Sequence, residues 1–257
     1  MRIAVTTALD PDPSESDAAE RVAVRYGWPA TARDGRSFAK VAASCDVDWL
    51  LILSARRVSL WADGVERVWT PGMGELRLKR LLSGERTTHD GLLDAADLRP
   101  GDAVLDATLG LGMDALVVAG AVGPTGSVVG LEASTLLAAM AAEGFLRLPA
   151  EAAGRIVVAA IDADTYLAQA SPRSFDVVLF DPMFRQGRAQ GGSFDLVREF
   201  GDAAPLTVER LARARHVARR WVVVKDGAPG LDLQRLGLTP LPYARGAGRL
   251  YARVAPL

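Results

Sequence analysis

Two short apolar runs, each ending in a loop, constrain the fold of this chain more than any other feature. Residues 104–112 are Val-Leu-Asp-Ala-Thr-Leu-Gly-Leu-Gly, and residues 177–184 are Val-Val-Leu-Phe-Asp-Pro-Met-Phe. A short apolar run that stops at glycine or proline is typical of a buried strand in a parallel sheet. Ligands of such sheets bind beyond the carboxyl ends of the strands. Both loops are therefore expected at a binding edge.

The chain from residue 92 onward alternates between strand-like and helix-like patterns, which is typical of a parallel sheet with crossover helices. Two last strands, near 241–243 and at 249–254, flank a turn at 245–248 and predict a C-terminal antiparallel hairpin. The fold class is thus α/β, a Rossmann-like domain with a mostly parallel seven-stranded sheet. Its other predicted elements are strands at 103–106, 127–131, 155–160, 175–180 and 221–225, and helices at 113–121, 135–146, 165–170 and 207–218.

Residues 1–74 are predicted to form a small N-terminal α/β appendage, and residues 75–257 the main domain. Polar residues at 14–17 and Ser37 have the character of helix N-caps. A basic helix near 76–82 either packs on the main domain with its charges in water or contacts phosphate. The appendage is expected to contain a strand at 2–8, helices ending near 26 and 44, strands at 49–53, 57–61 and 65–69, and a turn at 63–64.

Composition narrows the class of protein. The single cysteine cannot form an internal disulfide, and the two histidines are too far apart in sequence to indicate a zinc site. A net charge of −1 gives no sign of nucleic-acid binding. The N-terminus does not resemble a signal peptide, and the apolar runs are too short for a membrane span. A cytoplasmic protein without metal or membrane anchor is expected.

The glycine loop matches the fingerprint G-x-G-x-x-G/A at residues 110–115, and Glu132 follows at the end of the next strand. Enzymes that bind nicotinamide, flavin or S-adenosylmethionine share this arrangement, in which the acid accepts hydrogen bonds from ribose hydroxyls. Asp106 ends the strand just before the loop. Its charge would repel a pyrophosphate and attract the ammonium group of S-adenosylmethionine, which is therefore the predicted cofactor.

Two further acids, Asp162 and Asp164, follow the third strand of the main domain. A carboxylate at this place can accept a hydrogen bond from the adenine amino group, or it can cap the helix that begins near Thr165. One of the two is expected to be the cap, and Asp162 is predicted to contact the adenine.

The loop after the fourth strand, Asp181-Pro182-Met183-Phe184, carries the predicted catalytic chemistry. The Asp181 carboxylate and the Pro182 carbonyl can accept hydrogen bonds from both N–H groups of an exocyclic amine, which turns the nitrogen lone pair towards a methyl donor. Phe184 can stack on the face of a base. The alternative is a strand-ending turn in which Met183 and Phe184 are simply buried.

These segments resemble a family of class I S-adenosylmethionine-dependent methyltransferases that includes the bacterial small-subunit ribosomal RNA guanine-N2 methyltransferase. The resemblance runs from about 76 to 251 and is strongest to an uncharacterised Gram-positive branch, which is similar around 75–85 and 184–185. The pieces that carry it are 106–112, 114–115, Glu132, 181–184 and 222–225.

The resemblance implies that Met113, Asp114, Glu132, Ala133, Asp164 and Asp181 line the cofactor site. With the residues reasoned above, the predicted cofactor-binding set is Asp106, Thr108, Gly110, Gly112, Met113, Asp114, Glu132, Ala133, Asp162, Asp164 and Asp181. The guanine-modifying relative has a proline after its DPMF tetrapeptide, whereas Arg185 follows here, with Gln-Gly-Arg at 186–188. The resemblance therefore implies the cofactor more directly than it implies the target base.

The sequence thus predicts a methyltransferase that acts on an exocyclic amine of an RNA base, with guanine N2 of 16S ribosomal RNA as the specific candidate. Arg185, Arg188 and Lys225 are predicted to contact phosphate. The alternatives are a small-molecule or protein methyltransferase on the same fold, and a non-catalytic cofactor-binding assembly or sensor protein. A nicotinamide dehydrogenase is disfavoured because no Tyr-Lys or His-Asp pair lies near the expected loops.

Overall fold

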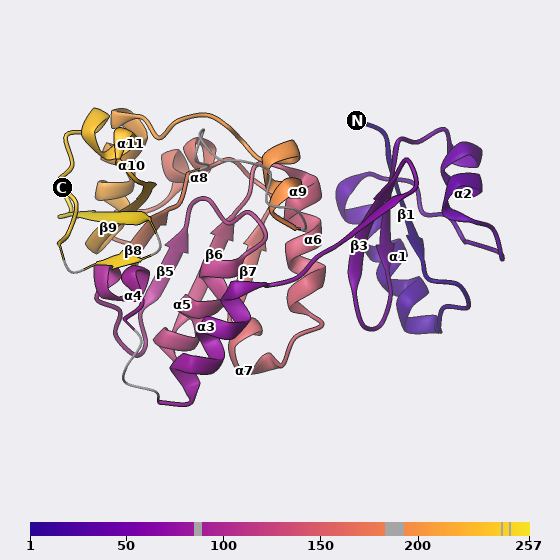
Figure 1. Ribbon diagram of the computed structural model, residues 1–257, viewed down its shortest axis with the longest axis horizontal. Coiled ribbons are helices and arrows are strands. Elements are labelled where there is room, and N and C mark those ends of the chain that lie inside the picture. Colours follow the sequence, from indigo (N-terminus) through magenta and orange to yellow (C-terminus); the bar gives the residue numbers. More distant parts are fainter. Residues whose placement is uncertain (85–88, 183–192, 243, 247) are drawn as a thin grey trace.

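The computed structural model describes residues 1–84, 89–182, 193–242, 244–246 and 248–257. Two sheets organise these residues, one of four strands and one of seven. Figure 1 shows the four-stranded sheet in indigo and violet on one side and the seven-stranded sheet on the other, joined by the segment between β4 and α3. None of the helices in these ranges is long and apolar enough to cross a membrane.

The four-stranded sheet is built by the N-terminal residues. Its strand order is β1-β2-β3-β4, with β1 and β2 parallel and the other neighbours antiparallel. Ser37 caps α2 as expected, whereas the cap of α1 is Asp12, just before the predicted 14–17, in a capping box with Glu15. The elements are β1 (Ile3–Thr7), α1 (Pro13–Tyr26), α2 (Phe38–Cys45), β2 (Trp49–Leu53), β3 (Val58–Ala62) and β4 (Val65–Val68).

The seven-stranded sheet has the order β10-β11-β9-β8-β5-β6-β7. The five strands from β9 to β7 are parallel, and β11 and β10 add an antiparallel end, so the predicted mostly parallel sheet is confirmed. The strands are β5 (Ala103–Asp106), β6 (Ser127–Leu131), β7 (Ile156–Ala159), β8 (Phe175–Phe180), β9 (Ala218–Gly227), β10 (Arg245–Gly246) and β11 (Arg249–Val254).

Helices cover both faces of this sheet (Figure 1). The sequence patterns predicted the long helices to within a few residues and missed the four short ones α4, α7, α9 and α11. The helices are α3 (Met73–Leu82), α4 (Gly91–Ala96), α5 (Met113–Val122), α6 (Thr135–Phe145), α7 (Ala150–Ala153), α8 (Ala163–Gln169), α9 (Ser193–Phe200), α10 (Val208–Val217) and α11 (Leu231–Arg235).

The predicted first strand of the C-terminal hairpin was wrong. Residues 241 and 242 are not in a strand, and the strand that forms the hairpin with β11 is β10, inside the segment predicted as the turn. Leu241 still donates its N–H to the Tyr251 carbonyl at 2.7 Å. Pro240 and Pro242 flank it, and because proline has no N–H, the ladder cannot continue there.

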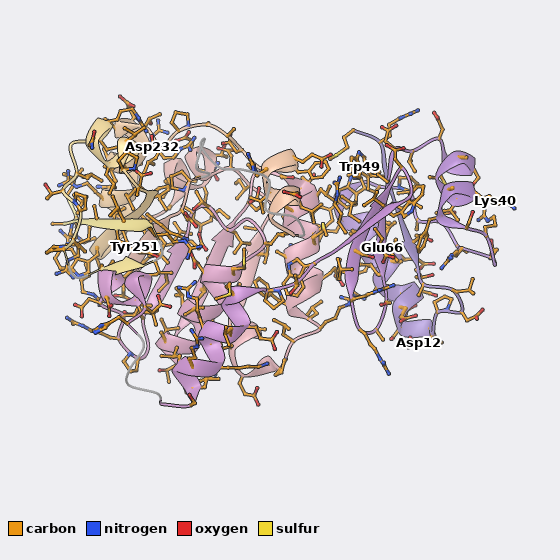
Figure 2. The ribbon with its side chains drawn as sticks, in the orientation of Figure 1. Asp12, Lys40, Trp49, Glu66, Asp232 and Tyr251 are labelled. Atoms are coloured by element: carbon orange, nitrogen blue, oxygen red, sulfur yellow. The ribbon has the colours of Figure 1, made fainter. Side chains whose placement is uncertain are left out.

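One continuous apolar core links the two sheets. It includes Val5 and Leu60 of the small sheet together with Leu137 and Met140 of α6. Trp49, labelled in Figure 2 at the border of the small sheet, meets the ring of Phe200 in α9 edge-on, with 4.9 Å between centroids. The boundary between appendage and main domain, placed after residue 74, stays a prediction. Helix α3 begins at Met73, one residue before that boundary.

Candidate active site

The glycine loop leaves β5 and turns sharply into α5. Gly112 is the N-cap of α5 and has a φ of 81°, in the left-handed region that favours glycine. A Cβ at this position would lie 2.2 Å from Cζ of Phe145 in α6. Glycine is therefore required here both by the backbone and by the close approach of an aromatic ring.

Glu132, directly after β6, holds this loop in place. Its Oε2 accepts a hydrogen bond from the Gly110 N–H at 2.9 Å, and its Oε1 accepts one from the Ser134 N–H at 2.8 Å. The side chain is buried, and burial raises the pKa of Glu132 against these two hydrogen bonds. Each carboxylate oxygen has two lone pairs, so Glu132 can accept further hydrogen bonds from a ligand.

A cavity opens at the carboxyl ends of β5, β6 and β8, and its space is roughly 610 Å³ including the part open to solvent. Six of the predicted site residues line it: Thr108, Gly110, Glu132, Ala133, Asp181 and Pro182. Ten other residues complete the wall: Ala107, Leu131, Ala163, Phe180, Val197, Gly201, Asp202, Ala204, Leu206 and Arg210.

Asp181 is fixed from two directions. Its N–H donates to Oγ1 of Thr108 at 2.6 Å, which ties the end of β8 to the loop after β5. Its Oδ2 lies 2.5 Å from Nζ of Lys225, and its side chain keeps 34% exposure. Burial raises the pKa of Asp181, while the nearby Lys225 ammonium opposes this rise.

Lys225 does not face solvent, so the predicted contact with phosphate was wrong. Its side chain is only 9% exposed, and Nζ is also 2.7 Å from Oδ2 of Asp114. Although burial opposes the charge, the carboxylates of Asp181 and Asp114 hold the pKa of Lys225 above its ordinary value. Both carboxylates are ion-pair partners of the ammonium in the interior of the protein.

Arg77 of α3 forms ion pairs with Asp114 and with Asp90. It donates to Oδ1 of Asp114 and forms two bonds with Asp90, Nε to Oδ2 at 2.7 Å and Nη2 to Oδ1 at 2.9 Å. Burial opposes the charge of Asp114, yet Lys225 and Arg77 hold its pKa well below the ordinary value. Asp114, predicted to bind the cofactor, is therefore engaged by two cations and does not line the cavity.

Asp106 lies beneath the cavity wall and is not part of its surface. Its side chain is buried, and Oδ1 accepts a hydrogen bond from the Thr108 N–H at 3.1 Å. Burial raises the pKa of Asp106 to about 7, with a smaller contribution from the charge of Asp114.

The acids after β7 have other partners than expected. Asp162 is the N-cap of α8, its Oδ1 accepting from the Thr165 N–H at 2.8 Å, so the capping role falls to the residue assigned to the adenine. Asp164 instead pairs with Arg210 at 2.6 Å and Arg213 at 3.3 Å. Neither acid lines the cavity.

The remaining predicted positions lie elsewhere. Met113 is outside the cavity wall and faces the segment between β4 and α3, where a Cβ added at Gly72 would lie 3.4 Å from its Sδ. Phe184, Arg185 and Arg188 lie outside the described residues, so their predicted roles stay predictions.

Asp202 is the one carboxylate of the cavity wall that the sequence analysis did not predict. It follows α9, and its Oδ1 accepts from the Ala204 N–H at 2.8 Å. Burial is the main cause of the raised pKa of Glu132, and the charge of Asp202, which lines the same cavity, adds to it. The apolar spacing of Phe194, Leu196, Val197 and Phe200 was a helix signal that would have brought this segment into view.

The carboxylates of the wall fit S-adenosylmethionine. Glu132 stands where ribose hydroxyls would donate, and Asp181 and Asp202 make the wall acidic, as suits a ligand that carries a sulfonium and an ammonium group. A pyrophosphate cofactor would be repelled by the same three carboxylates. Glu132, Asp181 and the backbone at Gly110 are the groups that would hold the cofactor.

Comparison with known proteins agrees with this chemistry. The model of a family described as "Putative SAM-dependent methyltransferase" matches residues 77–235. YpiP of Bacillus subtilis, an uncharacterised protein, is 31% identical over 229 residues, covering 86% of this chain and 88% of its own length. Ribosomal RNA small subunit methyltransferase J of Alkalilimnicola ehrlichii is 35% identical over 165 residues, 59% of this chain and 61% of that protein.

Among solved structures, the SAM-dependent methyltransferase NGO1261 of Neisseria gonorrhoeae superposes with a TM-score of 0.62 at 21% identity, over 98% of this chain and 95% of that one. This likeness confirms the Rossmann-like methyltransferase fold. The chain belongs to the family of SAM-dependent methyltransferases, and its methyl donor is S-adenosylmethionine.

Proposed function

We propose that this methyltransferase modifies an exocyclic amino group of an RNA base, with guanine N2 of 16S ribosomal RNA as the specific candidate and the cytoplasm as its place of action. The observation that carries the proposal is the position of Asp181. Its partly exposed carboxylate and the adjacent Pro182 line the same cavity as Glu132, the residue proposed to hold the cofactor. With the donor bound against Glu132, a hydrogen-bond acceptor at the end of β8 would stand beside it.

An exocyclic amine is a weak nucleophile because its lone pair is delocalised into the ring. S-adenosylmethionine supplies an electrophilic methyl group when it is bound. The Asp181 carboxylate and the Pro182 carbonyl would accept hydrogen bonds from the amine and orient its lone pair. The negative charge of Asp181 would also stabilise the positive charge that builds on nitrogen and receive the proton it releases.

The RNA part of the proposal is supported by relatives. Two proteins named Ribosomal RNA small subunit methyltransferase J match 48% and 59% of this chain. The DPMF tetrapeptide at 181–184 is shared with the resembling family. Stacking of Phe184 on the base and phosphate contacts by Arg185 and Arg188 remain part of the proposal as sequence-based predictions.

A small-molecule or protein methyltransferase is the second candidate. The net charge of −1 favours it, because RNA-binding proteins usually carry a basic surface. Affinity for RNA that falls steeply with added salt would favour RNA over this candidate, since phosphate contacts release counterions. A non-catalytic sensor would bind S-adenosylmethionine yet keep its biological role after Asp181→Ala.

The deciding experiment is mass spectrometry of modified nucleosides in ribosomal and transfer RNA from a strain that lacks this protein. Loss of one methylated base, restored by the wild-type gene but not by Asp181→Ala, is the expected result. Circular dichroism checks that the variant still folds, and isothermal titration measures how much affinity for S-adenosylmethionine it keeps. An unchanged RNA profile would refute the RNA proposal and turn the search to DNA, proteins and small amines.

A further inference from the structure

We propose that Lys225, Asp114 and Arg77 form a positioning chain that holds the carboxylate of Asp181 in the orientation needed to receive the amine. The inference rests on the proposed function, because it assumes that Asp181 is the group that receives the substrate. It adds three positioning residues that do not line the cavity, one of them on a helix outside the strand-and-loop motifs.

The first link is Lys225 itself. It stands on β9, beside the end of β8, and its Nζ lies 2.5 Å from Oδ2 of Asp181 and 2.7 Å from Oδ2 of Asp114. An ammonium between two carboxylates has its position set by both, so it cannot follow one carboxylate if that rotates. Lys225 thus fixes Oδ2 of Asp181 and leaves Oδ1, in the described part of the chain, for a ligand in the cavity.

The second link is Arg77, which keeps Asp114 in place. Its guanidinium reaches Asp114 on one side and makes a two-bond contact with Asp90 on the other. Asp90 is itself fixed as the N-cap of α4, with its Oδ1 accepting from the Leu92 N–H at 3.1 Å. The planar fork of arginine suits this geometry better than a lysine would.

Because α3 packs closely on α5, the side chain of Arg77 can contact Asp114. A Cβ on Gly74 would lie 2.5 Å from the Met113 carbonyl, and a Cβ on Gly120 would lie 2.3 Å from Cδ1 of Leu78. The two helices therefore touch backbone to backbone at one end and side chain to backbone at the other. Arg77 and Asp114 sit between these contacts, where their side chains are 19% and 15% exposed.

Stability alone is a weak reason to bury this set of charges. Buried ion pairs seldom stabilise a fold more than apolar residues of the same volume would. The set of ion pairs that includes the positioning residues has three carboxylates and two cations. In order of contact they are Asp90, Arg77, Asp114, Lys225 and Asp181. Of these three carboxylates, Asp181 alone lines the cavity.

Other charged or titratable groups also face Asp181 and enter any pH dependence. They are Asp106 of β5 and Asp114 of α5, which repel its charge, and Lys225 of β9 and Arg249 of β11, which attract it. Tyr251 of β11 pairs in register with Lys225, and burial raises its pKa to about 12, so it stays neutral in the working range.

The test compares Lys225→Met with a matched control on the same strand, Arg220→Met. Arg220 makes a similarly buried ion pair with Asp102 at the opposite end of β9, far from the cavity wall. The readouts are the pKa of Asp181 from carbon-13 NMR of labelled aspartates and the pH profile of methyl transfer to RNA from the deletion strain. Titration with S-adenosylmethionine provides the third readout.

Loss of the Lys225 charge should raise the pKa of Asp181, moving the acid limb of the profile upward by about one unit or more. It should also lower kcat by roughly 100-fold, the scale of a lost electrostatic contact, with the affinity for S-adenosylmethionine within about threefold of wild type. Arg220→Met should move neither the pKa nor the profile. An unshifted pKa and profile in Lys225→Met would overturn the proposal.

Asp114→Asn gives an independent check, decisive also where Lys225→Met does not fold. It removes a like charge and leaves Lys225 to Asp181 alone, so the pKa of Asp181 should fall rather than rise. A rise or no change in the pKa of Asp181 would contradict the proposed positioning chain. Asp181→Ala, which removes both acceptor oxygens, separates the two proposals. Retained RNA methylation by that variant refutes the role given to Asp181 in the proposed function, whereas its loss beside a wild-type-like Lys225→Met refutes only the positioning chain.

Discussion

Lys225 contacts Asp181 across 44 residues of sequence, Nζ to Oδ2, and the same ammonium contacts Asp114 across 111 residues. The strand register explains the first contact: Val224 pairs with Phe180, so the next residue on each strand lies at the same sheet edge. A lysine that looked like a phosphate ligand in the sequence is therefore part of the interior of the site.

Asp106→Asn should stabilise the fold at high pH. Its carboxyl has a pKa of about 7 in the folded chain, above the ordinary 3.8, so the folded state binds more protons than the unfolded state between these values. The contribution of Asp106 to stability is thus complete below pH 4 and lost as pH rises through 7. The variant should raise Tm by several degrees at pH 8 and leave it nearly unchanged at pH 4.

Calorimetry at both pH values makes this measurement. The asparagine oxygen can still accept from the Thr108 N–H, so the loop geometry is kept. An equal shift at pH 4 and pH 8 would contradict the raised pKa of Asp106.

Glu132→Gln should weaken S-adenosylmethionine binding. Both carboxylate oxygens accept from backbone N–H groups, at Gly110 and Ser134, and a glutamine must present its NH₂ to one of these donors. The loop would then move, and an acceptor for the ribose would be lost. We expect an affinity loss of roughly tenfold to 100-fold, about 1.4 to 2.7 kcal/mol, by isothermal titration.

Ser14→Ala is a suitable control for this measurement, because Ser14 lies in the exposed first turn of α1, far from the cavity wall. Its affinity for S-adenosylmethionine should equal that of wild type. Wild-type affinity in Glu132→Gln would remove Glu132 from the cofactor site.

Gly112→Ala should destabilise the fold far more than Gly27→Ala. Both glycines have a positive φ, 81° and 69°, which costs about 1 to 2 kcal/mol for alanine. Gly27 has open space around it, whereas a Cβ on Gly112 would lie 2.2 Å from Cζ of Phe145. Overpacking should add about 1 to 3 kcal/mol at Gly112 alone.

Urea denaturation of the two variants gives the comparison. Similar losses of unfolding free energy would mean that Phe145 moves aside at no cost. In that case the glycine would be required by its backbone angle only.

Much of the fold could be predicted from sequence because its signals are local. The strands at 103–106, 127–131 and 175–180 were predicted with their observed bounds, since each is an apolar run with a turn residue nearby. The strand predicted at 241–243 failed because two prolines interrupt an otherwise apolar segment. The family and the cofactor followed from motifs that lie within single loops.

The interior of the site could not be predicted in the same way. Arg77 and Asp114 are 37 residues apart and meet only because α3 packs against α5. Asp162 and Asp164 are both acids near the start of one helix, and only the geometry of α8 shows that Asp162 is the cap. Pairings of this kind depend on tertiary contacts that leave no pattern in a single sequence.

Trp69→Phe should impair cofactor binding from outside the cavity. Trp69 follows β4, and its Nε1–H donates to the Leu111 carbonyl in the glycine loop at 3.1 Å. Its ring also meets Phe145 edge-on, with 5.7 Å between centroids. Phenylalanine keeps most of the packing but loses this hydrogen bond, so about 1 kcal/mol of stability and a severalfold loss of S-adenosylmethionine affinity are expected.

Trp221→Phe is the matched control, because the buried Nε1 of Trp221 has no hydrogen-bond partner among the described residues. The same substitution there removes no hydrogen bond and should leave the affinity for S-adenosylmethionine unchanged. Titration and thermal melts of both variants separate the two effects. If Trp69→Phe lowers Tm but binds S-adenosylmethionine as wild type does, the hydrogen bond to Leu111 supports the fold and not the cofactor loop.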